Sequence, residues 1–448
     1  MPSQGDLDAF STWLHANNCI YPHIQFNHSE EGHGIGIFAA TSTTLDPNDL
    51  LASVPTSLCL NASRVLALGK ASLSPEAKVL HHALAQIRVL LESDSPTSSM
   101  SQSTWERTVM VIFLVFARIM APGISNPGAG TALDLSFWIP YINILPETLS
   151  TPLTYPDNSP EHALFPHTGL EHAVTGKLAK LQREFASYLP FLTPISQTIP
   201  FSLFQWADGI FWSRVISFHS LTDIPTTPYP PTPEDENLTL VNPSTNPTPF
   251  PTTTPSDDLH LVPLIDFCNH SFYPQMRWNI STPSPSPSPT LTITSSTQTP
   301  TIELRATTYI TPTTPSGTQQ ITRGQELFIT YGTKPNLELV FMHGFAVEDN
   351  PYDTVQLRAP FVEEQMESSG VEVAEIIRDK VAFMQKLGLR PFVEVLNRQG
   401  DGAKEGGEDV AGGVLGRNSL VTMLVCVLTQ EDGFGRVGED EFVIGGEE

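Results

Sequence analysis

The sequence predicts an α+β protein in which short β-strands flank a long block of helices. Strand-like segments occur before residue 61 and again after residue 260, whereas residues 62–205 show mainly helical spacing of apolar side chains. Tracts rich in proline, serine and threonine interrupt the second strand-rich part. With 448 residues, the chain is long enough for two or three domains with a sizeable core.

The N-terminal part is predicted to begin with a helix and continue with strands. Residues 7–18 carry apolar side chains at helical spacing. In residues 32–40 (GHGIGIFAA), alternating isoleucine and glycine predict a strand after a glycine turn. Residues 50–55 and 56–60 are two further strand candidates on either side of a proline junction.

The block of helices is the longest regular part of the chain. Ser74-Pro75-Glu76 has the pattern of a helix start, because serine caps helices and proline is favoured at the first helical position. The predicted helices cover residues 75–93, 103–120, 176–192 and 204–218. The last of them returns the chain to the strand-rich part.

A change of character marks residues 261–272 (LVPLIDFCNHSF). The apolar beginning predicts a buried strand, and Asp266, Asn269 and His270 follow directly on it. Polar groups so close to a core must be hydrogen-bonded, or each costs about 1–3 kcal/mol. One interpretation is a structural turn with satisfied side chains, and the other is a functional site.

The remaining strands and the C-terminal part are interrupted by biased segments. Residues 223–258 and 282–300 cannot bury a core and are expected to be disordered insertions. The other elements predicted here are strands at 278–280, 301–306, 327–330 and 351–357 and a helix at 371–387.

Composition narrows the class of partner. The chain has 48 acidic against 23 basic residues, a formal net charge of −25, which argues against nucleic acid and suits a basic protein partner. The same acidity would also keep a protein soluble. The four cysteines show neither metal-ligand spacing nor a disulfide framework, so no metal site is predicted. The apolar runs are too short to span a bilayer, and no secretion signal follows Met1, so a cytoplasmic or nuclear monomer is expected.

Three motifs in order carry a family resemblance. GHGIGIFAA at residues 32–40, DFCNHS at residues 266–271 and GQELFITYGTKPN at residues 324–336 resemble the SET-domain protein methyltransferases. They are most similar to the branch of Rubisco large-subunit and ribosomal-protein lysine methyltransferases. WIPY at residues 138–141 resembles a further stretch of this family. The resemblance covers roughly residues 7–400.

The resemblance implies a domain organisation. It divides the chain into an N-terminal part of the SET domain (1–61), a helical insertion (62–205), a C-terminal part of the SET domain (206–346) and a mainly helical substrate-docking lobe (347–448). This lobe looks short here, so that either it is truncated or the end of the sequence is atypical.

The resemblance also implies S-adenosyl-L-methionine as cofactor and assigns roles to single residues. The cofactor would be held by His33, Gly34, Ile35, Arg214, Asn269, His270 and Tyr331. Tyr331 would be the catalytic tyrosine, with its hydroxyl directed at the acceptor nitrogen. Because methyl transfer depends mainly on alignment and polar contacts, the motifs need no strong general base.

The substrate pocket leaves alternatives open. Its expected residues are Arg214, Asp266, Trp278 and His343. Asp266 either faces the acceptor or holds its own loop. His343 stands where lysine-specific members carry a tyrosine, and some relatives methylate histidine, whose side chain is mostly neutral at pH 7.

The leading hypothesis is therefore a protein-lysine N-methyltransferase that acts on a basic non-histone protein, such as a ribosomal protein or a translation factor. A protein-histidine methyltransferase is the second hypothesis, and a non-catalytic SET-like binding module is the third. The short C-terminal lobe and the proline-rich insertions motivate the third hypothesis, whereas intact Asn269, His270 and Tyr331 weigh against it.

Overall fold

The computed structural model describes two compact units of the chain. The first comprises Met1–Thr154, Leu178–Pro225 and Thr253–Thr333, and the second comprises Tyr155–Lys177, Thr226–Thr252 and Lys334–Glu448. Within them the described residues are 2–29, 34–71, 75–93, 102–165, 168–196, 198–219, 257–281, 300–307, 319–358, 379–380, 382–383, 392–396, 414–415, 435–436 and 442–443.

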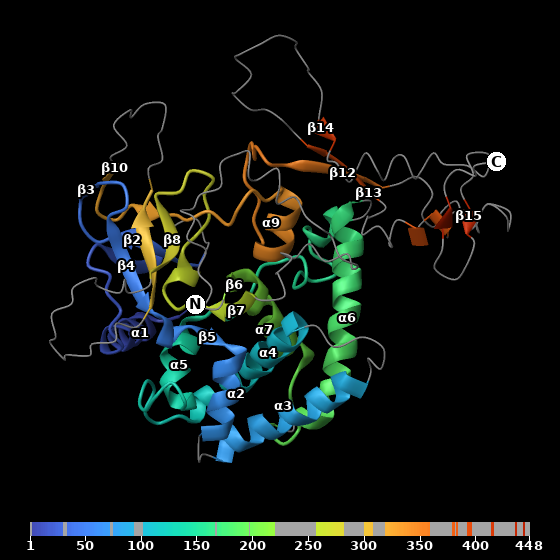
Figure 1. Cartoon of the computed structure of the whole chain (residues 1–448), viewed down its shortest axis with the longest axis horizontal. Coiled ribbons are helices and arrows are strands. Elements are labelled where there is room, and N and C mark those ends of the chain that lie inside the picture. The colour runs from blue at the N-terminus through green and yellow to red at the C-terminus, as the bar shows by residue number, and fades with distance from the viewer. Residues whose placement is uncertain are drawn as a thin grey trace, which may run out of the picture. The chain divides into compact units, whose positions relative to one another are not determined.

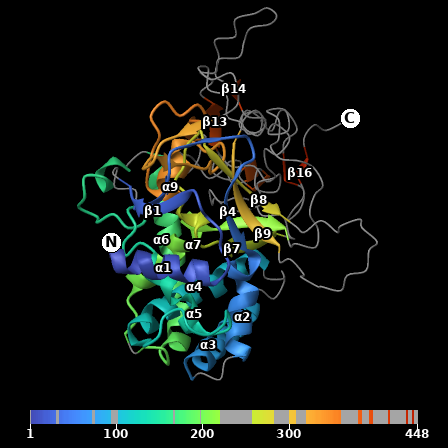
Figure 2. The same ribbon diagram turned by 90° about the vertical axis from the view of Figure 1, so that its left-hand side faces the viewer.

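Helices of the first unit gather beside its short sheets, as both views show (Figures 1 and 2). They are α1 (Gln4–Ala16), α2 (Ala62–Ala71), α3 (Pro75–Ser93), α4 (Gln102–Met120), α5 (Leu135–Ile144) and α7 (Phe201–Arg214), joined by the C-terminal part of α6 (Gly169–Leu192). Helix α4 contacts α2, α3, α5 and α7. It can do so because residues 109–117 are apolar on all sides and buried, as expected for a central helix.

The predicted helices are largely confirmed, and several of their ends differ from the predicted bounds. Helix α3 has the predicted bounds, and Ser74 lies outside the described residues. Helix α6 begins seven residues before Gly176, because a helix tolerates an interior glycine at a cost of about 1 kcal/mol. Helix α7 ends at Arg214 instead of continuing to Phe218, since the β-branched pair Val215-Ile216 enters an extended strand.

The strands of the first unit form four small antiparallel sheets, ordered β1-β2-β11, β10-β3, β4-β9-β8 and β5-β7-β6. Their bounds are β1 (Ile24–His28), β2 (Ile35–Ala39), β3 (Thr43–Leu45), β4 (Leu50–Pro55), β5 (Leu60–Asn61), β6 (Ile216–His219), β7 (Asp257–Leu261), β8 (Met276–Ser281), β9 (Thr301–Ala306), β10 (Gln319–Ile321) and β11 (Glu326–Leu327). Strand β2 is buried along its whole length, between β1 and β11. The register pairs Phe38 with both Gln25 and Glu326.

Several strand predictions need correction. The predicted strand at 56–60 is a 3₁₀ turn (Thr56–Leu58) followed by the two-residue β5, and the strand at 327–330 is reduced to β11 and a single bridge at Ile329. Strand β9 has the predicted bounds. Both proline-rich tracts lie almost entirely outside the described residues, and the last two residues of the first tract begin β7.

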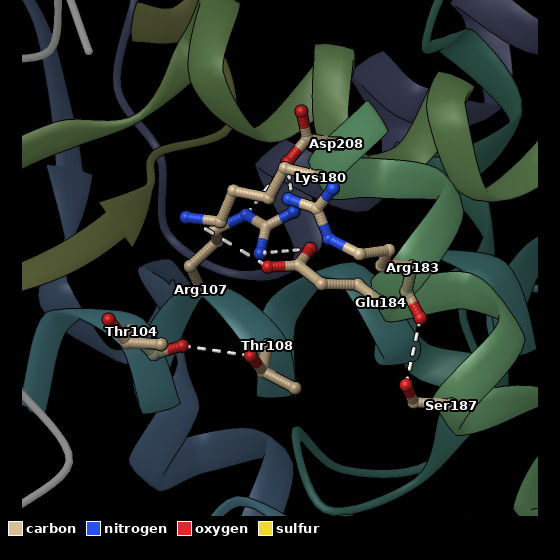
Figure 3. A network of polar contacts seen from close by, with 8 residues as sticks. All are labelled: Thr104, Arg107, Thr108, Lys180, Arg183, Glu184, Ser187 and Asp208. Carbon is tan, nitrogen blue, oxygen red and sulfur yellow. Dashed lines mark hydrogen bonds and ion pairs between the residues drawn. The ribbon is translucent and has the colours of Figure 1, made fainter. Parts of the chain in front are cut away.

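A buried ion cluster joins three helices of the first unit (Figure 3). The Arg107 guanidinium of α4 contacts Asp208 Oδ1 of α7 at 2.5 Å and Glu184 Oε2 of α6 at 2.8 Å. The three side chains are 6%, 1% and 15% exposed, respectively. Such a cluster fixes the helices relative to each other because each charge needs its partner away from water.

In the second unit, α9 (Asn336–His343) is tied to the chain that follows it. The Asn336 side chain donates to the Val347 carbonyl and accepts from the Val347 N–H, both at 2.9 Å, and Gly344 ends the helix with a left-handed φ of +82°. The described strands here are β12 (Thr354–Arg358), β13 (Phe392–Leu396), β14 (Val414–Leu415), β15 (Gly435–Arg436) and β16 (Phe442–Val443). The helix predicted at 371–387 lies mostly outside the described residues.

None of the helices within the described ranges combines the length and the apolar character that a bilayer crossing requires. The division into four sequence regions stays a prediction.

Candidate active site

The loop after β7 builds the base of the site. The strand predicted to begin at Leu261 is wrong: β7 ends at this residue, and the chain turns at Leu264, whose φ of +83° is rare for a branched residue. A 3₁₀ turn (Ile265–Phe267) follows and leads into Cys268 and Asn269. The apolar side chains stay buried, so the turn places Asp266 inside the core instead of at its surface.

Backbone hydrogen bonds join this loop to the segment that ends at Tyr331. Ile329 N–H donates to the Asn269 carbonyl at 3.0 Å, and Ser271 N–H donates to the Ile329 carbonyl at 2.9 Å. The Tyr331 N–H donates to His270 Nδ1 at 3.0 Å, which assigns the proton of the neutral imidazole to Nε2. Asn269, His270 and Tyr331, three of the predicted site residues, are therefore brought together.

The Tyr331 hydroxyl has a defined hydrogen-bonding direction. It donates to the Cys268 carbonyl at 2.8 Å. Burial raises the pKa of this hydroxyl above its usual value, so it stays protonated at neutral pH. Because a hydroxyl has one hydrogen and two lone pairs, this oxygen faces any further partner as an acceptor.

Glu326 is a site residue that sequence reasoning missed, although it stands in the GQELFITYG motif. Its Oε1 accepts from Asn269 Nδ2 at 2.6 Å, and its Oε2 accepts from the Ser29 hydroxyl at 3.0 Å. A Cβ atom at Gly36 would lie only 2.3 Å from Glu326 Oε1, so the carboxylate occupies the space that this glycine leaves. The third glycine of GHGIG, Gly36, therefore allows this side chain to approach the backbone closely.

Asp266 and Tyr141 form a buried pair beside Tyr331. The Tyr141 hydroxyl, on α5, donates to Asp266 Oδ2 at 2.5 Å, whereas Oδ1 is buried without a hydrogen-bond partner. Burial raises the pKa of Asp266 to about 7, although the Arg214 charge and the Tyr141 hydrogen bond both lower it. Tyr141 belongs to the WIPY stretch, which was recognised in the sequence without a role.

Arg214 ends α7 directly at this pair. Its Nη1 donates to the Asp266 carbonyl at 2.5 Å, its guanidinium lies 4.8 Å from the centre of the Phe267 ring, and its Nε is buried without a hydrogen-bond partner. The structure therefore places Arg214 next to Asp266, and their shared substrate role stays a prediction. Both side chains keep one buried polar atom for a further partner.

The remaining predicted residues are placed less closely. Gly34 has a left-handed φ of +85° and accepts from the Ser29 N–H at 2.8 Å, and an added Cβ there would meet no atom within 4 Å. Ile35 is buried at the start of β2, and His33 lies outside the described residues. Trp278, on β8, has its ring 6.3 Å from that of Phe218.

His343 belongs to the other unit, where it occupies the last turn of α9 and its ring lies 6.0 Å from that of Phe345. Its predicted role in the pocket stays a prediction. Among the described residues, no group of three or more histidine, cysteine or acidic side chains is arranged to hold a metal ion.

The elements and motifs described above define the fold of a SET domain. Two crystal structures support this with TM-scores of 0.50. The first is the SET domain of LSMT bound to lysine and AdoHcy, which is 17% identical and covers 89% of this chain and 68% of its own. The second is the same domain bound to methyllysine and AdoHcy, which is 15% identical and covers 97% of this chain and 73% of its own.

Among curated proteins, the chain is similar to a ribosomal lysine N-methyltransferase, set10 of Schizosaccharomyces pombe. The two are 26% identical over 223 residues, which is 50% of this chain and 30% of that relative. No family model matches the sequence.

Proposed function

We propose that this protein is an S-adenosylmethionine-dependent protein-lysine N-methyltransferase. The observation that carries the proposal is that hydrogen bonds join Tyr331 to Cys268 and His270, in the same loop as Asp266 and Asn269, within a SET fold. The curated relative is named a lysine methyltransferase, and the solved domains were crystallised with lysine or methyllysine and AdoHcy.

The residues present fit the proposed cofactor. Arg214 Nε is a buried donor with no protein partner and suits a carboxylate, and Gly34 leaves open space beside a backbone that can approach a ligand closely. Asn269 and His270 are held in place by Glu326 and by the Tyr331 backbone. When bound, S-adenosylmethionine supplies a methyl group on a positively charged sulfur.

Tyr331 would contribute an oxygen that accepts a hydrogen from the target amine. The hydroxyl donates its own hydrogen to the Cys268 carbonyl. Its oxygen can therefore align the amine by accepting a hydrogen from it and does not donate to the amine nitrogen. Such preorganised alignment accounts for most of the rate gain expected in methyl transfer.

Asp266 favours lysine over histidine as the acceptor. Its Oδ1 is a buried carboxylate oxygen without a partner, and an ammonium group entering the site would satisfy it. A neutral imidazole would provide a single N–H and no charge. A protein-histidine methyltransferase, suggested by His343, remains the alternative activity.

The proposed substrate is a basic non-histone protein, of which ribosomal proteins and translation factors are examples. The net charge of −25 supports it, because an acidic enzyme attracts a basic partner over long distances. The name of the curated relative points to the ribosome.

The test is methyl transfer to lysate proteins with radiolabelled cofactor, comparing wild type, Tyr331→Phe and the control Tyr21→Phe. We expect a discrete labelled band that Tyr331→Phe weakens about 100-fold or more, since an aligning oxygen is lost. Tyr21, whose hydroxyl bonds Ser11 at 2.8 Å, should be dispensable.

Mass spectrometry of the labelled band should then find the methyl group on lysine. A methyl group on histidine would establish the alternative activity. Absence of cofactor binding in calorimetry would instead support a non-catalytic binding module.

A further inference from the structure

Tyr141 is a buried hydroxyl that no role in the proposed reaction yet explains. It lies on α5, a helix of the insertion that is buried at eight of its ten positions, and its side chain is 0% exposed. The ring packs against Phe267 at 6.3 Å and Phe10 at 6.4 Å, which fixes the direction of the hydroxyl. That direction leads to Asp266 Oδ2 at 2.5 Å.

The surroundings of Asp266 make this hydrogen bond distinctive. Arg214, on α7, donates to the Asp266 backbone carbonyl and not to its carboxylate. Tyr331 donates to Cys268, and the buried Cys268 thiol lies in the same loop as Asp266. Within the described residues, no side chain other than Tyr141 donates a hydrogen bond to the Asp266 carboxylate.

We propose that Tyr141 is a positioning residue of the methyl-transfer site: by holding Asp266 Oδ2, it presents Oδ1 as the acceptor for the target ammonium. This inference rests on the proposed lysine methyltransferase activity. It assigns a function to the helical insertion beyond packing, because α5 supplies the group that orients and supports the acceptor carboxylate.

The ionisation of Asp266 links this geometry to pH. Burial raises the pKa of the carboxyl to about 7, and the Tyr141 hydrogen bond and the Arg214 charge lower it. Tyr331 and Cys268, the other titratable groups near it, have pKa values raised by burial and stay neutral in this range. Removing the Tyr141 hydroxyl therefore raises the pKa of Asp266 further. The ionised carboxylate then forms only at a higher pH than in the wild type.

The first experiment measures kcat/KM for Tyr141→Phe and wild type from pH 5.5 to 9.5. A hydrogen bond to a charged group corresponds to a shift of about one pH unit. We expect the acidic limb to move upward by about that amount, with kcat/KM about fivefold lower at pH 7, about tenfold lower below pH 6 and nearly equal at pH 9. The control Tyr21→Phe should leave the ratio to wild type constant.

A loss that is equal at all pH values would overturn the proposal, because it would indicate a structural role alone. The ratio between variant and wild type is used because ionisation of the target amine changes both enzymes alike.

The second experiment follows unfolding of the full chain by urea as a function of pH and needs no activity. A carboxyl whose folded pKa is raised stabilises the fold below its ordinary pKa, and this contribution is lost as pH rises toward about 7. Tyr141→Phe should extend the loss to higher pH by about one unit, and Asp266→Asn should abolish it.

If Tyr141→Phe lost stability over the same pH window as the wild type, the proposed positioning of Asp266 by Tyr141 would be overturned. A wild-type protein that shows this window but transfers no methyl group would instead overturn the proposed function, so the two failures are distinguishable.

Discussion

Glu326 joins three separate chain segments through one carboxylate. It accepts hydrogen bonds from Ser29 before β2 and from Asn269 in the loop after β7. Its carboxylate also occupies the space where a side chain at Gly36 would lie. Ser29 and Asn269 are 297 and 57 residues away from it in sequence, respectively. A single residue therefore sets the spacing between β2 and the predicted cofactor-binding pair.

Gly36→Ala should disrupt this arrangement, because the new Cβ would lie 2.3 Å from Glu326 Oε1 and 3.2 Å from Asn269 Nδ2. We expect displacement of the carboxylate, a loss of about 1–3 kcal/mol in unfolding free energy and weaker binding of S-adenosylmethionine. Urea denaturation and calorimetry measure the two effects.

Gly176→Ala is the matched control. Its added Cβ meets no atom within 4 Å, and alanine in a helix interior should stabilise the protein by about 0.5–1 kcal/mol. If both variants were equally stable, the proposed crowding at Gly36 would be contradicted.

At the scale of elements, α4 organises the helices that support the site. It contacts α5, which carries Tyr141, and α7, which carries Arg214. The Arg107 cluster adds buried ion pairs that join α4, α6 and α7 within this apolar packing (Figure 3). The position of Arg214 therefore depends on residues far from the loop that it contacts.

Arg107→Leu should destabilise the first unit by about 3–5 kcal/mol, because two carboxylates would remain in the interior without their cation. The measurement is equilibrium unfolding by urea. Glu92→Gln is the control, since its pair with Arg88 is more than half exposed and should change stability by at most about 0.5 kcal/mol. If both variants lost a similar unfolding free energy, the buried Arg107 cluster would contribute no more to stability than an exposed ion pair.

At the scale of the whole molecule, charge is the dominant property. The excess of 25 negative charges creates a field that favours encounter with a basic protein. Such attraction is screened by salt, with a Debye length of about 10 Å at 0.1 M.

The proposed substrate class therefore predicts a salt effect. Raising NaCl from about 50 to 500 mM should lower kcat/KM for a basic protein substrate about tenfold, mainly through KM. A peptide with the same target lysine but with its neighbouring lysines replaced by glutamine is the control and should respond much less. An equal response of both would contradict electrostatic attraction of the substrate.

The sequence alone determined the SET fold class, the order of its motifs and the block of helices. These features are local: Pro75 starts α3, apolar residues at helical spacing define α4, and Tyr331, Asn269 and His270 were found from short motifs. Local patterns suffice because helix starts, apolar periodicity and glycine turns depend mainly on neighbouring residues.

Only the tertiary structure decided how the site is assembled. Tyr141 and Asp266 are 125 residues apart, and no periodicity links a helix of the insertion to a loop carboxylate. The apolar run that begins at Leu261 is a turn instead of the predicted strand, because the residues before it, Asp257–Leu261, pair with β5 and β6. Helix α7 ends at Arg214 because the residues that follow enter β6. Contacts between distant segments depend on how the elements pack, so the residues that support the site are set by the fold and not by their local sequence.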